Sequence, residues 1–209
     1  SEILQKNIFV KIKPKPFNPS IIKEKNNNFI NEFSSIDFEN IDLDNFSLKK
    51  QEFIKTLLPL VSYENQKIFI ERKNLENLKT LLINNKTLSN KNLLYLNKIA
   101  KNYKIDKINK HKLDLVNELL LSVDIIPNAI VLAQAANESG WGTSRFAKEY
   151  NALFGEYTYD FSNGVVPLRR EVGAKHLVKS FTSVDKSVQS YFKNLNTHYA
   201  YKEFRYVRK

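Results

Sequence analysis

Residues 125–147 read IIPNAIVLAQAANESGWGTSRFA, and this stretch carries the strongest structural signal in the chain. Pro127 suits the first turn of a helix, because its missing N–H would find no partner there. The side chains that follow it are nearly all small or apolar, which predicts a helix buried on most of its sides. Glu138 comes at the end of this predicted helix, and Gly140 and Gly142 break the helix directly after it.

Glu138 is the candidate for chemistry in this stretch. The negative end of the helix dipole and apolar surroundings both disfavour a charged carboxylate. Trp141, three residues on, is expected to shield the side chain from water. A carboxyl that stays protonated near neutral pH can act as the general acid at a glycosidic oxygen. The sequence is also compatible with a glutamate that simply faces solvent at a frayed helix end.

Upstream, the spacing of apolar side chains predicts a helical scaffold over residues 45–147. Apolar residues recur at i, i+3 and i+4 in four runs, as in helices that bury one face. Pro59 falls inside the first run, so we expect the helix to kink or end there. The four runs are Phe53–Val61, about 65–84, Leu93–Ala100 and Leu113–Leu120.

The first 44 residues show no sustained apolar period. Prolines, an asparagine run and an acidic stretch punctuate them, which is typical of an extended or flexible arm or linker over 1–44. The chain has no methionine and begins with Ser1, so we expect a processed or cropped piece, with any signal peptide or membrane anchor in a preceding part. We expect cropping after Lys209 as well, because an aromatic-rich stretch reaches that end without a stop signal.

The composition changes sharply in the last third of the chain. All five glycines lie between Gly140 and Gly173, and so does the single tryptophan. A window rich in glycine and aromatic residues predicts an irregular or β segment that carries a site. Alternating stretches at 156–161 and 177–181, around Ser162-Asn163-Gly164, predict a small hairpin-like β lobe over about 155–182, followed by a helix from about 183.

Composition and spacing exclude several kinds of site. The chain has no cysteine, which excludes disulfides, cysteine-ligated zinc, iron–sulfur clusters and cysteine nucleophiles. His111, His176 and His198 lack the spacing of a zinc motif, and Ser139 does not lie in a serine hydrolase motif. The glycines match neither phosphate-loop pattern, so we expect no metal and no cofactor. No apolar run approaches the roughly 20 residues that a membrane span needs.

The chain is strongly basic, with 33 Lys and Arg against 22 Asp and Glu and a formal net charge of +11. Such a balance attracts polyanions, which include nucleic acid, anionic lipid and a bacterial wall with its acidic polymers. A biased composition alone would also account for it. The basic residues are spread over the chain rather than gathered with stacking aromatics, so we expect no nucleic-acid partner.

A longer and highly specific motif surrounds Glu138. The run from Ala133 to Ala147, with Asn151-Ala152-Leu153-Phe154-Gly155 after it, closely resembles the endo-β-N-acetylglucosaminidase family of peptidoglycan hydrolases (glycoside hydrolase family 73). The nearest branch is the Bax-like one, and the likeness spans roughly 45–209. The marks of that branch are Val123-Asp124-Ile125-Ile126-Pro127, Asn194-Leu195-Asn196-Thr197-His198, Ala200-Tyr201, Phe204-Arg205 and Arg208, with Phe53-Ile54, Leu57-Leu58-Pro59-Leu60 and Asn65 upstream.

The resemblance implies a fold and an activity. The fold would be mainly α (α+β), a lysozyme-like helical domain over 45–209 with a small β lobe across a glycan cleft. The activity would be hydrolysis of the β-1,4 bond after N-acetylglucosamine in peptidoglycan, with Glu138 in the position of the family's catalytic acid. Peptidoglycan glycan strands would be the partner, at a periplasmic or cell-envelope location, and we expect a monomer.

The second catalytic group is open. In the wider family an acidic residue of the β lobe, often followed by tyrosine, serves the oxocarbenium-like transition state. Glu171 is the nearest candidate by position, although Val172 follows it, and Glu156 and Asp160 also lie in the lobe. For each of the three, a surface residue is the more common interpretation. The substrate's own N-acetyl group as nucleophile, or a single carboxyl as in lytic transglycosylases, are alternatives, and retaining or inverting chemistry is undecided.

Four aromatic residues near the proposed acid are candidates for substrate binding, because flat apolar rings suit sugar faces. Trp141 and Phe154 are as consistent with packing at the junction of helix and lobe as with ligand contact. Tyr157 and Tyr159 alternate with polar residues, so one strand face is expected to look into the cleft. A catalytically silent module that binds peptidoglycan, or a lytic transglycosylase, are the alternative functions.

Overall fold

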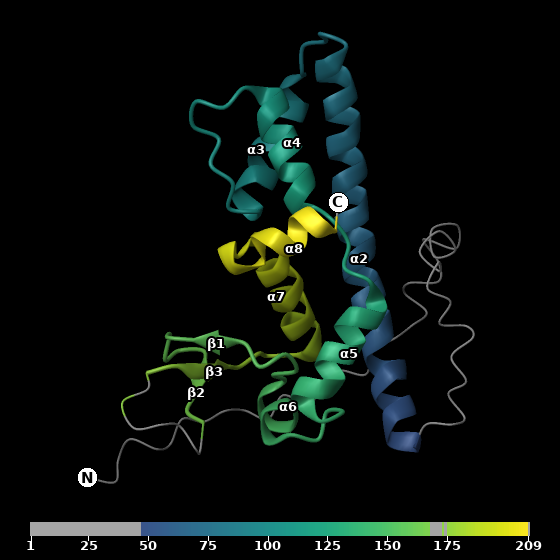
Figure 1. Ribbon diagram of the computed structural model, residues 1–209, viewed down its shortest axis with the longest axis vertical. Helices are drawn as coiled ribbons and strands as arrows, with labels where there is room; N and C mark the ends of the chain where they lie inside the picture. The colour runs from purple at the N-terminus through teal and green to yellow at the C-terminus, as the bar shows by residue number, and fades with distance from the viewer. Residues whose placement is uncertain (1–46, 168–172, 174, 209) are drawn as a thin grey trace. The chain divides into compact units, whose positions relative to one another are not determined.

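The structure of the chain is a computed structural model, and it describes residues 47–167, 173 and 175–208 (Figure 1). These residues are mainly helical with one small antiparallel sheet, which confirms the predicted fold class. The predicted arm over residues 1–44 lies outside the described residues. None of the described helices is long and apolar enough to cross a membrane.

The helices alternate with short connections until the sheet interrupts them. In chain order the helices are α2 (Leu48–Ile83), α3 (Asn90–Asn102), α4 (Lys112–Ser122), α5 (Asn128–Ser139), α6 (Arg145–Tyr150), α7 (Val184–Thr197), the 3-10 turn η4 (Tyr199–Tyr201) and α8 (Lys202–Val207). The strands are β1 (Tyr157–Thr158), β2 (Gly164–Val165) and β3 (Leu177–Lys179).

The chain divides into two compact units, which are described separately. Unit 1 holds the described residues up to Phe53 together with those from Gln134 to Ser187. Unit 2 holds Ile54–Ala133 and the described residues from Val188 onward. The division falls inside α2, α5 and α7, so the chain passes from one unit to the other within helices.

The longest helix, α2, continues through Pro59. Of the two outcomes expected at Pro59, an end of the helix does not occur, and the first two predicted runs belong to one helix. A proline inside a helix removes one backbone hydrogen bond. Leu57 and Val61 on either side are buried, as is Ile68, and burying one such side chain contributes about 1.5–3 kcal/mol. Packing of the apolar face therefore outweighs the local cost of the proline.

In unit 2, α3 and α4 pack along α2 (Figure 1). The core between them is apolar, as the i, i+3, i+4 pattern predicts. It is formed by Leu75 and Leu78 of α2, Leu96 and Ile99 of α3, and Val116 and Leu119 of α4, with Phe192 of α7 also buried.

Asn65 is a buried polar residue of α2, and both the nitrogen and the oxygen of its side chain make hydrogen bonds. Its amide nitrogen donates to the carbonyl of Ile126 at 2.7 Å and to Oδ1 of Asn128 at 2.8 Å. Its oxygen accepts from the N–H of Ile126 at 2.9 Å. Because buried polar groups need partners, this pairing fixes the segment that enters α5 against α2.

A charged cluster closes the other end of the α4–α5 connection. The guanidinium of Arg72 donates to the carbonyls of Leu120 and Val123 and lies 3.5 Å from the carboxylate of Asp124. Arg208 of the C-terminal segment reaches the same carboxylate at 3.7 Å. Burial lowers the pKa of Arg208 to about 10, so its guanidinium is still charged at neutral pH.

The sheet of unit 1 has the order β1-β3-β2, and both neighbouring pairs are antiparallel (Figure 1). The two alternating stretches that the sequence assigned to the lobe, 156–161 and 177–181, contain β1 and β3, which pair antiparallel as expected, and β2 adds a third strand on the other side of β3. Val178 of β3 lies opposite Tyr157 on one side and Val165 on the other. A Cβ at Gly164 would lie 2.5 Å from the Leu177 side chain, so glycine allows β3 to run this close to β2.

Candidate active site

Glu138 lies on the exposed face of the last turn of α5. Ala135, Ala136 and Ser139 are buried on the opposite face, whereas Gln134, one turn before Glu138, is exposed like it. The expectation that Glu138 is enclosed by apolar residues was therefore wrong. The small residues before Glu138 make this part of α5 apolar in composition, but only one face of it is covered.

A tight turn follows Glu138 and is fixed by hydrogen bonds. Gly140, Trp141 and Gly142 have φ angles of 57°, 58° and 74°, so three successive residues adopt the left-handed conformation. The buried hydroxyl of Ser139 donates to the carbonyl of Ala135 and accepts from the N–H of Gly142 at 2.8 Å. For Trp141, which is not glycine, this backbone costs about 1–2 kcal/mol.

The packing of Trp141 offsets that strain. Its ring meets Phe53 edge-on, with 5.6 Å between the ring centroids. The Lys50 amine lies 4.9 Å from the centre of the indole ring, which is the geometry of a cation–π contact. Both partners come from the first turns of α2 and belong to unit 1. Trp141 thus packs against the start of α2, which is a different partner from the junction of helix and lobe that the sequence suggested.

The backbone at Gly155 lies directly against the Glu138 carboxyl. Gly155 has a φ of +60°, and a Cβ placed on it would lie 3.2 Å from Oε2 of Glu138. The segment before it is anchored by Asn151, whose side chain donates to the carbonyl of Phe181 at 2.9 Å. The structure therefore brings Glu138 to the start of the β lobe, as the motif that joins them in sequence suggests.

The predicted second carboxylates have different surroundings. The Glu156 side chain is 10% exposed and lies 3.8 Å from the amine of Lys179. Asp160 is exposed and accepts hydrogen bonds from the N–H of Ser162 at 2.9 Å and from the amide of Asn163 at 3.2 Å. Hydrogen bonding from Ser162 lowers the pKa of Asp160. These local contacts favour a role for Asp160 in stabilising the turn. Glu171 lies outside the described residues.

The aromatic candidates separate into one core residue and a surface pair. Phe154 is only 7% exposed, which favours its packing alternative. Tyr157 and Tyr159 are 67% and 75% exposed, so their rings are open to a ligand. The imidazole of His176 lies 4.7 Å from the Tyr157 ring, between centroids.

Two members of this exposed surface were not predicted. Phe161 is exposed like Tyr157 and Tyr159 and continues their odd-numbered alternation, so the pattern did contain its signal. His176 lies beside Tyr157 because β3 pairs with β1, and a local pattern holds no signal for such a pairing. Over the described ranges, no three His, Asp or Glu residues are grouped to hold a metal ion.

The part of the chain that carries the candidate site matches a known protein family. Residues 113–209, which contain α5, the turn after it and the β lobe, match the family model "Glucosaminidase: Mannosyl-glycoprotein endo-beta-N-acetylglucosaminidase". This part of the chain is therefore similar to the glucosaminidase family, whose description is that of a glycan hydrolase.

A relative extends the likeness upstream of that match. The chain is 36% identical over 163 residues to protein Bax of Escherichia coli (strain K12), and the alignment covers 77% of this chain and 55% of Bax. The chain thus spans about half the length of the curated relative it matches. No solved structure matches the chain.

Proposed function

We propose that the protein is a peptidoglycan hydrolase that cleaves the β-1,4 bond after N-acetylglucosamine, with Glu138 as the general acid. The observation that carries this proposal is the approach of Glu138 to Gly155, at the entry to a lobe with exposed tyrosines. An acid beside open aromatic rings is the arrangement that a glycan hydrolase needs.

The chemistry at Glu138 begins when a glycan strand covers it. A bound sugar would exclude water from the exposed carboxyl, so that the proton is transferred directly between the carboxyl and the sugar. The carboxyl then gives its proton to the glycosidic oxygen as the bond between that oxygen and the anomeric carbon breaks. The fixed turn behind Glu138 and the backbone of Gly155 hold the carboxyl in place for this transfer.

The positive charge that develops on the sugar needs a second group. Glu156, Asp160 and Glu171 are the protein's candidates, and the substrate's acetamido oxygen is the alternative nucleophile. Attack by water on the anomeric carbon of N-acetylglucosamine gives a hydrolysis product with a reducing end. An anhydro end on a muramic sugar would instead mean that the other β-1,4 bond, after N-acetylmuramic acid, breaks and that this sugar's own 6-hydroxyl attacks its anomeric carbon. The first outcome defines a hydrolase and the second a lytic transglycosylase.

The proposed partner and location follow from the substrate. Peptidoglycan strands lie in the bacterial envelope, so the protein would act there, in the periplasm or at the wall, as a monomer. A net charge of +11 supports this setting, because a basic surface is drawn to an anionic wall. Exposed Tyr157 and Tyr159 would stack on the sugar rings.

The decisive experiment is digestion of purified peptidoglycan, followed by mass analysis of the released ends. Glu138→Gln should reduce release by about 10²–10⁴-fold, as expected for loss of a general acid. Glu149→Gln is the matched control, because it makes the same change at an exposed glutamate of α6 in the same unit. Equal release by wild type and Glu138→Gln would remove Glu138 from the mechanism.

Two further outcomes would redirect the proposal. Anhydro-muramic ends would favour a transglycosylase. Binding to insoluble peptidoglycan without any release, by the wild type as well, would favour a glycan-binding module.

A further inference from the structure

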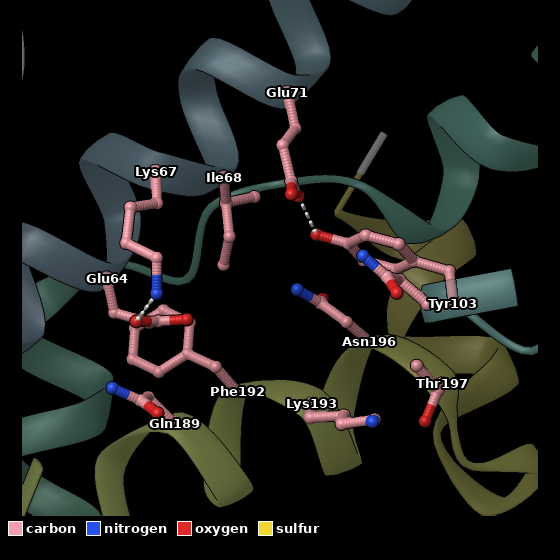
Figure 2. A pocket seen from close by; sticks show the side chains of 11 residues that line it. Glu64, Lys67, Ile68, Glu71, Tyr103, Gln189, Phe192, Lys193, Asn196 and Thr197 are labelled. Carbon is pink, nitrogen blue, oxygen red and sulfur yellow. Dashed lines mark hydrogen bonds and ion pairs between the residues drawn. The ribbon is translucent and has the colours of Figure 1, made fainter. Parts of the chain in front are cut away.

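Unit 2 contains a cavity of about 390 Å³ that the proposed reaction does not use (Figure 2). It is lined by α2, the C-terminal end of α3 and α7, and all of its residues belong to unit 2. Ile68 and Phe192 are buried beneath it and give it an apolar floor. The rest of the lining is polar or charged, and includes two glutamates and two lysines.

Two of the four charges neutralise one another along α2. The Lys67 amine lies 2.6 Å from the carboxylate of Glu64, in an i, i+3 ion pair. The Glu64 side chain is only 13% exposed, so this pair is set into the wall of the cavity. A ligand would meet it as a neutral dipole rather than as a free charge.

Glu71 is the acidic group that a ligand can use. Its carboxylate accepts a hydrogen bond from the Tyr103 hydroxyl at 2.6 Å, and it makes no ion pair with any residue in the part of the chain that the structure describes. Burial raises the pKa of Glu71 against the opposing effects of Tyr103, Lys67 and Lys98. An ammonium group that entered the cavity would form the direct ion pair that Glu71 does not make with the described residues.

Lys193 is the basic group that a ligand can use. It projects from α7 on the side of the cavity opposite Glu71 (Figure 2), and it makes no ion pair with the described residues. Thr197, one turn further along α7, adds a hydroxyl to the same side. An ammonium with a neighbouring hydroxyl is a suitable partner for a carboxylate.

We propose that this cavity binds a zwitterionic amino-acid group, with the ligand's ammonium at Glu71 and its carboxylate at Lys193. A ligand with one charge would satisfy one of these groups and leave the other unpaired, so the cavity discriminates against it. The apolar floor suits the aliphatic part of such a group. The inference goes beyond the proposed function and depends on unit 2 alone. The source is either a free amino acid or the charged ends of a short peptide, such as a wall peptide.

Calorimetric titration of the 209-residue chain tests the proposal. The zwitterionic probes are L-alanine, D-alanine, the dipeptide alanyl-alanine and a soluble wall tripeptide; butylamine and butyrate each carry one charge. At least one zwitterion should bind saturably, and at least tenfold more tightly than either singly charged probe. Binding by the free amino acids or only by the peptides identifies the source. No saturable binding of any zwitterion up to about 10 mM would overturn the proposal.

Variants connect the binding to the named residues. Lys193→Ala removes an exposed side chain, and Glu71→Gln keeps a hydrogen-bond acceptor for Tyr103, so both should fold. Each should weaken binding at least tenfold. Lys91→Ala is the matched control, because Lys91 is an exposed lysine of unit 2 that does not line the cavity. Unchanged binding by Lys193→Ala, or equal loss with Lys91→Ala, would overturn the proposal.

The same titration separates this proposal from the proposed function. Glu138→Gln should bind the zwitterion as tightly as the wild type does, because Glu138 belongs to unit 1. A protein that binds amino acids but releases no peptidoglycan fragments would retain this site and lose the proposed hydrolase function. A protein that releases peptidoglycan fragments but binds no zwitterion would retain the proposed hydrolase function and lose this site.

Discussion

At the scale of single residues, Gly155 sets the geometry of the candidate acid. Any side chain there would start 3.2 Å from Oε2 of Glu138, and the φ of +60° strains residues other than glycine. We expect Gly155→Ala to lower the free energy of unfolding by about 1–2 kcal/mol. It should also reduce peptidoglycan release, because the Glu138 carboxyl has to move.

Gly173→Ala separates these two effects. Gly173 also has a positive φ, of +87°, but nothing lies within 4 Å of the Cβ that alanine would add. It should lose stability in urea unfolding without a matching loss of activity. Equal losses of activity in the two variants would contradict the role given to the contact between Gly155 and Glu138.

Tyr157 provides a test of the exposed aromatic surface. Removing its ring in Tyr157→Ala should weaken binding to peptidoglycan by about 2–13-fold, since an aromatic contact is worth about 0.5–1.5 kcal/mol. Stability should hardly change, because the side chain is 67% exposed. Tyr199→Ala in unit 2 is the control, as Tyr199 is 83% exposed and lies outside the candidate site. A pull-down with insoluble peptidoglycan measures the affinity of the wild type and of both variants. Equal affinities of the wild type and Tyr157→Ala would exclude a contribution from Tyr157.

Glu71 should give the protein a pH-dependent stability. Its pKa in the folded state is raised above the ordinary value of 4.5 by burial, against the opposing effects of Tyr103, Lys67 and Lys98. The folded state therefore favours the protonated carboxyl. The contribution of Glu71 to the free energy of unfolding is fully present below pH 4.5, and it is lost as the pH rises through the raised pKa. Urea unfolding should show the wild type losing stability relative to Glu71→Gln over that interval, and parallel pH profiles would contradict this.

At the scale of elements, the sequence predicts what local spacing controls. The apolar stripe of α2 and the helix at Val184 follow from residue period and capping residues. The order of the strands does not, because β3 separates β1 from β2 through pairings with residues far away in the chain. Likewise, composition predicted α5 but not the exposure of Glu138, since exposure depends on which face other elements cover.

Pro59 is the clearest conflict between an element and its local sequence. We expect Pro59→Ala to raise the free energy of unfolding by up to about 3 kcal/mol, because alanine restores the missing backbone hydrogen bond and removes the steric clash. Pro127→Ala is the control, since Pro127 precedes the first residue of α5, where a proline is favourable. That variant should lose up to about 1 kcal/mol. Urea unfolding of both measures the difference, and a Pro59→Ala variant that is less stable would show that the proline is needed where it stands.

At the scale of the whole molecule, the sequence motifs are divided between the two units. The run around Glu138 and the lobe after it belong to unit 1, and they make the candidate site. The marks of the Bax-like branch at Asn65, Asp124, Asn196 and Arg208 all belong to unit 2. There they form buried polar contacts, with Asn65 bonded to Ile126 and the other three bonded or ion-paired with one another. We therefore expect these residues to stabilise unit 2.

Asp124 tests that interpretation, because it is the carboxylate that Arg72 and Arg208 share. Asp124→Asn leaves the largely buried Arg208 guanidinium without its anion, whereas Arg72 keeps its ion pair with Glu76, so we expect the free energy of unfolding to fall by about 3 kcal/mol. Glu118→Gln is the control: it removes a surface carboxylate that pairs with Lys110, and it should cost less than about 1 kcal/mol. Urea unfolding at neutral pH measures both. Similar losses in the two variants would mean that the cluster around Asp124 adds no more than an ordinary surface pair, and that the branch-specific residues of unit 2 need an explanation other than stability.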